Sequence, residues 1–148
     1  MGARVATTTA RRAYLPDVRP DDVLPIADEA VVVEFGALSL PANSVVQEAS
    51  LALFPSSRWR TGGGASSLWV RFVGRDGVFD AEPGGSVQLT GLARTPVRID
   101  VTPLVRAAFD RGETTQRLAL SVVGSPVAFV GPGSAEVRAR PRIEVLYR

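Results

Sequence analysis

The sequence contains no cysteine, no histidine and no lysine, so all seventeen of its basic residues are arginine. Without cysteine there is neither a disulfide framework nor a thiolate site for zinc or an iron–sulfur cluster. The missing side chains also exclude nucleophilic catalysis by a Ser–His or Cys–His pair, and general-base catalysis by lysine. We therefore expect a protein that is not an enzyme, with no catalytic residues and no cofactor.

Long apolar runs are also missing. Residues 1–15 hold no run long enough for the core of a signal peptide, and no segment approaches the roughly 18 apolar residues of a membrane-spanning helix. The net charge of +2 comes from 17 basic and 15 acidic residues, a balance that does not indicate nucleic acid or an anionic membrane as partner. We expect no Sec signal, no membrane insertion and no nucleic-acid partner.

Short runs of alternating apolar and polar residues, separated by turn residues, dominate the rest of the chain. Many such runs with only one short helix predict an all-β fold, an antiparallel β-sandwich of jelly-roll type. The alternation points Ala52 outward, and it predicts a last strand over residues 136–147 that breaks, bulges or lies at an edge at Pro141. The predicted core positions are Leu51, Leu53, Val70, Phe72, Ile99, Val101, Leu118, Leu120, Ile143 and Val145.

Residues 1–27 are expected to form an N-terminal strand followed by a proline-rich arm, and residues 28–148 the β-sandwich domain. Three prolines in residues 10–27 disfavour helix and central-strand pairing. The arm can wrap the surface of its own domain or reach a neighbouring subunit, and the sequence leaves both alternatives open. The residues expected at such an interface are Tyr14, Leu15, Val18, Val23 and Leu24.

A strand and a helix follow each other directly in residues 96–112. Residues 97–101 alternate apolar and charged side chains, Thr102 can cap a helix, and Pro103 suits the first helical position. Phe109 supplies the largest apolar side chain of this helix, and Gly112 can end it in the left-handed conformation. We expect this helix to plug one end of the sheet.

Three groups of residues form an ordered series of short motifs. In the middle are Asp100, Val101, Thr102, Leu104, Val105, Phe109 and Gly112. Upstream are Val33, Glu34, Phe35, Leu40, Pro41, Val45, Val46, Ala49, Leu51 and Leu53, and downstream are Phe129, Ser134, Glu136, Pro141, Ile143, Val145 and Tyr147. The series resembles the DNRLRE-type β-sandwich modules of extracellular bacterial proteins, some of which bind carbohydrate. The family's aspartate and Tyr-Gly pattern has no counterpart in residues 1–30, and residues 131–133 separate Phe129 from Ser134.

Arg58, Trp59 and Arg60 are the strongest candidates for binding, because they precede three glycines that let a partner approach closely. Trp59 can stack on a sugar face or anchor a protein interface, or it can fold back and cover the open end of the sandwich. Trp69 is a second candidate for a stacking platform in a carbohydrate-binding module.

Two further clusters of charged residues can be interpreted either as functional sites or as ordinary solvated surface. The carboxylates of Asp76, Asp80 and Glu82 can serve a glycosidase or bind calcium, but their spacing is not that of an EF-hand and Asp-Gly is a common turn pair, so we expect a solvated loop and no metal. Arginines 138, 140 and 142 can grip phosphate or an acidic partner, but Glu136 and Glu144 on the same face favour an ordinary charged exterior.

The function expected from these features is that of a non-enzymatic structural or adhesive component of a larger extracellular assembly, such as a bacteriophage minor tail or capsid accessory protein. Its partners are then other protein subunits, with the chain itself a homo-oligomer, and its location is extracellular or in a virion. The alternative is a carbohydrate-binding module of a cell-surface or secreted system, with a glycan as partner.

Overall fold

The computed structural model describes residues 3–14, 22–56, 66–73, 85–89, 96–113 and 116–148. Its strands are β1 (Arg4–Tyr14), β2 (Val23–Ile26), β3 (Val31–Phe35), β4 (Val46–Leu53), β5 (Ser66–Phe72), β6 (Gly85–Leu89), β7 (Val97–Asp100), β8 (Arg117–Val123), β9 (Val127–Val130) and β10 (Arg142–Tyr147). Its helices are α1 (Thr102–Asp110) and the 3-10 helix η1 (Val137–Ala139).

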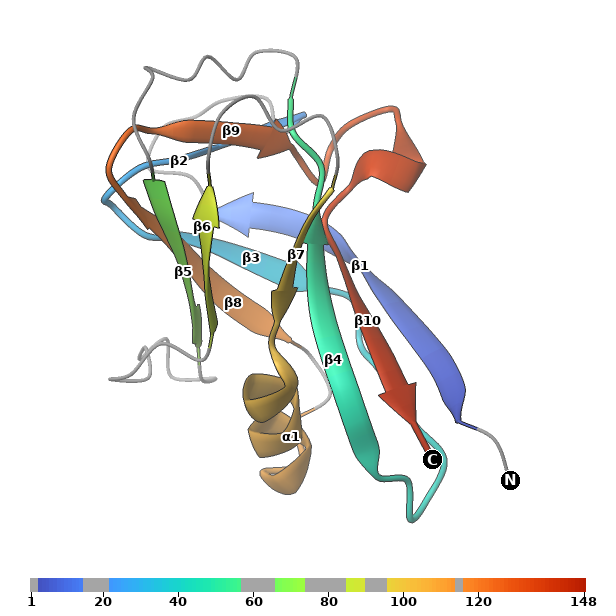
Figure 1. Ribbon diagram of the computed structural model, residues 1–148. Coiled ribbons are helices and arrows are strands. Elements are labelled where there is room, and N and C mark those ends of the chain that lie inside the picture. The colour runs from blue at the N-terminus through green and yellow to red at the C-terminus, as the bar shows by residue number, and fades with distance from the viewer. Residues whose placement is uncertain (1–2, 15–21, 57–65, 74–84, 90–95, 114–115) are drawn as a thin grey trace.

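One antiparallel sheet of eight strands forms the body of the molecule, in the order β6-β5-β8-β3-β1-β10-β4-β7. Strand β1 joins its two halves, because residues 4–9 pair with β10 and residues 10–14 pair with β3, with a register shift between Ala10 and Arg12. An irregularity of this kind bends a strand and increases its twist. The sheet therefore curls until its edge strands, β6 and β7, approach each other (Figure 1).

Two smaller elements lie at opposite ends of the curled sheet (Figure 1). Helix α1 packs against β4 at one end, and the β2–β9 pair lies at the other. Leu24, Ile26 and Phe129 of this pair are fully buried. The expected all-β, antiparallel architecture with one short α-helix is confirmed for the described residues, and the sheet is nearly closed.

The described parts of residues 1–27 belong to these sheets. Strand β1 lies inside the eight-stranded sheet, and β2 pairs with β9 from Val23↔Val130 to Ile26↔Val127. Pro25 lies opposite Ala128 in that pair. Because a proline cannot donate to a ladder, its position in this short two-stranded pair, outside the main sheet, follows from its chemistry.

The predicted core is confirmed. Every position that the alternation assigned to the interior belongs to one cluster of buried side chains. Ala52 is the exception among the residues expected to face outward, because it is also fully buried. Its direct partners on the two neighbouring strands are Arg142 and Arg98. A methyl group between two such long side chains is covered by their aliphatic stems.

The expected last strand divides at Pro141, as its chemistry suggested. Residues 137–139 form η1, β10 begins at Arg142, and the Pro141 carbonyl accepts a hydrogen bond of 2.8 Å from the Ala10 amide. The expected stripe of three arginines is therefore wrong, because Arg138 and Arg140 do not lie on this strand. Arg140 instead donates from Nε to the Ser134 carbonyl at 2.8 Å.

Arg142 belongs to a charged pair on the outer face of the sheet, as the plain interpretation expected. Its Nε donates to Glu144 Oε1 at 2.9 Å, and Arg98 on β7 donates to Glu144 Oε2 at 2.9 Å. These hydrogen bonds, with that of Arg98 the largest effect, hold the pKa of Glu144 below its ordinary value. The Arg142 guanidinium also lies over the Phe54 ring, 5.1 Å from its centroid.

The sheet comes nearest to closure at Gly85 on β6. A Cβ atom added there would lie 2.6 Å from the Asp100 carbonyl oxygen and 3.1 Å from Ile99 Cγ2. The first obstacle is backbone and the second is a fully buried side chain, so neither can move aside cheaply. Glycine at this position therefore lets β6 come close to β7.

We expect Gly85→Ala to lower the free energy of unfolding by about 1–3 kcal/mol, because the added methyl group forces the two edge strands apart. Ser86→Ala is the matched control, since Ser86 is exposed on the same strand. Urea denaturation of both variants measures the difference. Equal stability of Gly85→Ala and the wild type would contradict a close approach of β6 to β7.

Candidate functional site

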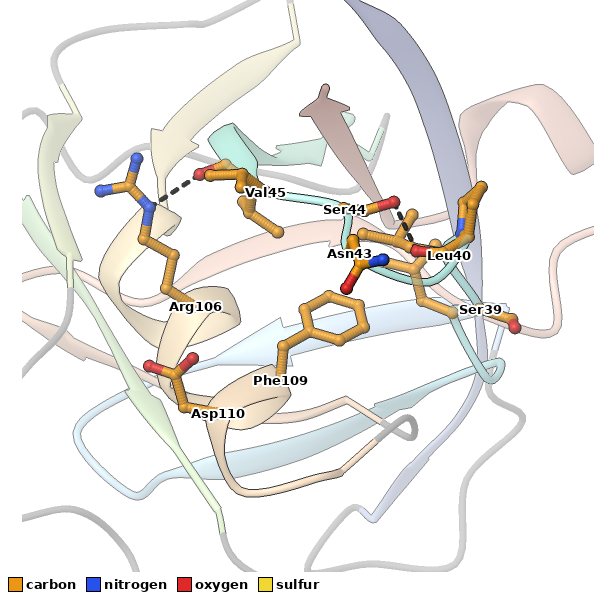
Figure 2. Close-up of a pocket in the computed structure, with 11 residues that line it drawn as sticks. Ser39, Leu40, Asn43, Ser44, Val45, Arg106, Phe109 and Asp110 are labelled. Carbon is orange, nitrogen blue, oxygen red and sulfur yellow. Dashed lines mark hydrogen bonds between the residues drawn. The ribbon is translucent and has the colours of Figure 1, made fainter.

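A hollow lies between helix α1 and the segment that joins β3 to β4 (Figure 2). We call it the α1 groove. Its volume of about 480 Å³ is within the range of ligand pockets. It is lined by Leu38, Ser39, Leu40, Pro41, Asn43, Ser44, Val45, Val46, Arg106, Phe109 and Asp110.

Helix α1 is held in place at its start by Asp100 and Thr102. The Asp100 carboxylate accepts hydrogen bonds from the Thr102 amide at 2.9 Å and from the Thr102 hydroxyl at 2.5 Å. The same hydroxyl accepts a hydrogen bond of 2.9 Å from the amide of Ala49 on β4. The expectation that Thr102 caps the helix is wrong, because Val101 occupies the cap position and the Thr102 hydroxyl is already bonded to β4 and Asp100.

The far end of α1 follows the sequence prediction. Gly112 has φ +73°, a conformation that glycine adopts without strain. The Gly112 amide donates to the Phe109 carbonyl and the Glu113 amide to the Ala108 carbonyl, both at 2.9 Å. These two bonds form a Schellman motif, which satisfies carbonyl groups that the helix end would otherwise leave free. Pro103 is the second residue of the helix, one position later than expected but still in the first turn, where a missing amide hydrogen costs no helical bond.

The facing wall of the groove is a tight turn at residues 41–44, which we call the 41–44 turn. The Ser44 hydroxyl donates to the Pro41 carbonyl at 2.6 Å, and the Ser44 amide donates to the same oxygen at 3.2 Å. Asn43 has φ +64°. Asparagine tolerates this left-handed conformation better than most residues, so the only asparagine of the chain stands where the backbone requires it.

Arg106 connects helix α1 to the start of β4. Its Nε donates to the Val46 carbonyl at 2.8 Å and its Nη2 to the Gln47 carbonyl at 3.1 Å. One helical side chain thus bonds two carbonyls at the start of β4. Helix α1 is therefore fixed against the start of β4, beside the groove, before any ligand arrives, which lowers the entropy lost on binding.

The groove combines an apolar interior with a polar rim (Figure 2). Leu38 and Val46 are buried, the Phe109 ring is half-buried, and Val45 is 62% exposed. Asp110 supplies the only carboxylate among the lining residues. The arrangement can receive an apolar side chain or the flat face of a sugar, while the pair of carboxylates that a glycosidase needs is not found among these lining residues.

The expected binding residues lie elsewhere. Arg58, Trp59 and Arg60 fall outside the described residues, as do the carboxylates at positions 76, 80 and 82. Trp69 is half-buried on β5, on the face of the sheet that points away from the core, and its direct partners are Ser86 on β6 and Ser121 on β8. Nearby, Gln88 Nε2 donates to Ser67 Oγ at 2.9 Å. Trp69 is thus an aromatic side chain among hydroxyl and amide groups.

The expected interface residues divide in the same way. Tyr14 is 50% exposed at the end of β1, and Val23 is half-buried. Leu24 is fully buried within its own chain, because its side chain alternates to the inner side of β2. Leu24 is therefore corrected from an interface residue to a core residue. Leu15 and Val18 lie outside the described residues.

Most residues of the α1 groove could not be predicted as site residues from the sequence. Phe109 was expected at the end of the sheet, and the turn at Pro41 and Asn43 was visible from its residue types. Val45 and Asp110 carry no signal of their own, because the groove is assembled from segments some 60 residues apart, as the bond from Arg106 to Val46 shows. Among the described residues, no group of three or more carboxylates could hold a metal ion, and no described helix could cross a membrane.

We expect the stability that Asp100 contributes through Thr102 to depend on pH. The hydrogen bonds from the Thr102 hydroxyl, and then from its amide, lower the pKa of Asp100 from its ordinary value of 3.8. Because the folded pKa is depressed, the contribution is complete above about pH 5 and is lost as pH falls through the folded pKa. The stability difference between the wild type and Asp100→Asn should therefore shrink from pH 7 to about pH 2.5.

Urea midpoints across this pH range measure the difference. Asp28→Asn, which changes an exposed aspartate, is the control for the loss of one negative charge. A difference between the wild type and Asp100→Asn that stays constant with pH would contradict the prediction.

No protein-family model matches the chain, and comparison with curated protein sequences finds no match either. The resemblance to DNRLRE-type modules therefore stays a prediction.

Proposed function

We propose that the chain is a non-enzymatic structural or adhesive component of a larger extracellular assembly, of the kind represented by bacteriophage minor tail and capsid accessory proteins. In this proposal a neighbouring protein subunit occupies the α1 groove. The observation that carries the proposal is that an exposed apolar side chain, Val45, and the half-buried ring of Phe109 line one groove, whose helix is tied to the start of β4.

The groove has the properties of a protein-binding anchor site. Apolar side chains in a concave site with a polar rim commonly mark contacts between proteins, and a small number of buried anchors carries most of the binding energy. Phe109 and Val45 offer such an anchor site, while Asn43, Arg106 and Asp110 offer hydrogen bonds at its rim. Since Arg106 already holds α1 against the start of β4, a partner loses little affinity to ordering the helix.

The proposal of a non-enzymatic role is supported by the chemistry of the chain. The sequence has no histidine, cysteine or lysine to act as base or nucleophile. The lining of the α1 groove has one carboxylate, Asp110. A glycosidase would need a second acidic residue roughly 5–10 Å away.

We further propose that the curled sheet is a jelly-roll sandwich of the DNRLRE type. In support, two residues of the Asp-Val-Thr motif that resembles the one in DNRLRE-type modules make structural hydrogen bonds here. Asp100 and Thr102 join β7, α1 and β4 through three hydrogen bonds. We expect a motif that makes such hydrogen bonds wherever a strand passes directly into a helix that covers the end of the sheet.

We expect Val45→Ser to weaken self-association of the chain by at least about tenfold, because it removes an apolar anchor from the groove. The free energy of unfolding should change by no more than about 0.5 kcal/mol, since the side chain is exposed. Val123→Ser, a change at an exposed valine on β8, is the matched control. Sedimentation velocity measures association. A wild-type chain that stays monomeric, or a Val45→Ser variant that associates normally, argues against the proposal.

A second candidate function, carbohydrate binding, is favoured by Trp69. Its ring lies on an outer face beside Ser86 and Ser121, where a sugar can stack on the ring while its hydroxyls bond the serines. We expect Trp69→Ala to abolish the retardation of the protein in gels that contain a soluble polysaccharide, while Val45→Ser leaves the retardation unchanged. Affinity electrophoresis with a panel of polysaccharides is the measurement. Equal mobility of the wild type and Trp69→Ala in every gel would exclude this site.

A further inference from the structure

We infer that the segment between β1 and β2 of one copy of the chain, residues 15–22, docks at the opposite end of the next copy, over the α1 groove and a second hollow beside it. The inference rests on the proposed function and names its partner, which is a second copy of this chain. The contact joins two different surfaces, so it is head-to-tail and builds a ring or an open filament.

The second hollow lies beside the 41–44 turn, which also lines the α1 groove. Its volume is about 390 Å³, and we call it the arginine hollow. It is lined by Arg4, Pro41, Ala42, Asn43, Ser44, Tyr147 and Arg148. Pro41, Asn43 and Ser44 are common to both hollows, so one extended ligand can lie across the turn and reach both.

Two cationic side chains meet at the arginine hollow. Arg4 lies directly opposite Tyr147 in the β1–β10 pair, and the backbone of Arg148 exchanges hydrogen bonds of 2.9 and 3.0 Å with Val45. Both arginines are thus carried by paired backbone. Among the described residues neither guanidinium lies within 4.0 Å of a carboxylate, unlike those of Arg98 and Arg142 on the outer face. The hollow therefore favours an anionic group, which guanidinium binds through paired hydrogen bonds.

The neighbouring hollows define the chemistry of their occupant. The α1 groove takes apolar side chains, and the arginine hollow takes negative charge. Each hollow also has one aromatic residue, Phe109 and Tyr147. Proline-rich segments bind aromatic-lined grooves because their extended backbone is already formed and little entropy is lost. The occupant should therefore be extended, proline-rich, partly apolar and acidic.

One segment of this chain has these properties. Residues 14–22 read YLPDVRPDD, with two prolines, the apolar side chains of Leu15 and Val18, and three aspartates against a single arginine. The described residues at its two ends, Tyr14 and Asp22, are exposed. Its charge and composition complement the two hollows.

The segment cannot reach the hollows of its own chain. Strand β1 separates Arg4, at the arginine hollow, from Tyr14, where the segment begins (Figure 1). Eleven residues of strand extend over about 33 Å. A loop of residues 15–21 must go out and return to β2, so it reaches at most about 13 Å from its ends. The arginine hollow is therefore out of reach within one chain, and we place the docking between copies.

The test uses the full chain and a fluorescently labelled synthetic peptide of sequence YLPDVRPDD, with binding measured by fluorescence anisotropy. We expect the Arg4→Gln/Arg148→Gln double variant to bind the peptide at least about tenfold more weakly than the wild type. Arg138→Gln, which removes one positive charge from exposed η1, should bind it normally. A peptide with asparagine at the three aspartate positions should bind more weakly than the parent peptide to the wild type. Its affinity for the double variant should be no lower than for the wild type, because this peptide has no carboxylates to pair with the two arginines.

Two outcomes overturn the inference. One is no binding of the parent peptide at concentrations up to about 1 mM, and the other is equal binding of the aspartate and asparagine peptides. If Val45→Ser still disrupts association in either case, the proposed function survives and only the identity of the occupant is wrong. Peptide binding that needs the two arginines but not Val45 supports the arginine hollow and overturns the role of the α1 groove.

Discussion

The hydrogen-bonded cluster of Asp100, Thr102 and Ala49 is the constraint on which the rest of the structure depends. It fixes the end of β7, the start of α1 and the middle of β4 at one point. The orientation of α1 then places Arg106 over the start of β4 and Phe109 at the end of the sheet, which creates the α1 groove. The carbonyl of Asp100 also faces Gly85, so the same residue lies where the sheet nearly closes.

Because arginine is the only basic residue of the chain, the ion pairs of the described residues all involve guanidinium groups. Glu34 lies between Arg12 and Arg117, at 3.1 and 3.0 Å, as Glu144 lies between Arg98 and Arg142. A carboxylate has enough acceptor sites for two guanidinium groups, and each such pair neutralises a glutamate while leaving one positive charge in excess. The pairs at the partly exposed Glu144 add little stability, whereas Glu34 is buried and its charge needs the two arginines as compensation. Arginines without such a partner are the ones available to other molecules.

Much of the fold was predictable because its signals are local. Alternation along β4, β8 and β10 identified the core, and Pro103 and Gly112 marked the limits of α1. The predictions failed where residues distant in sequence compete for the same hydrogen-bonding group. Thr102 was expected to cap its own helix, but the Ala49 amide, 53 positions away, takes its hydroxyl. The α1 groove was not predictable for the same reason, since sequence alone does not bring the 41–44 turn to α1.

The place of β1 in the sheet has a consequence for how the chain folds as it is made. Residues 4–9 pair with β10, which lies almost the whole length of the chain away, and residues 10–14 pair with β3. Strand β1 must therefore wait for β10, which is synthesised much later, before its ladder is complete. Such long-range pairing slows folding and leaves an unpaired strand edge exposed meanwhile. Val5 and the threonines of this strand are then exposed to non-native strand pairing during synthesis. Binding by a chaperone would protect this edge until β10 is made.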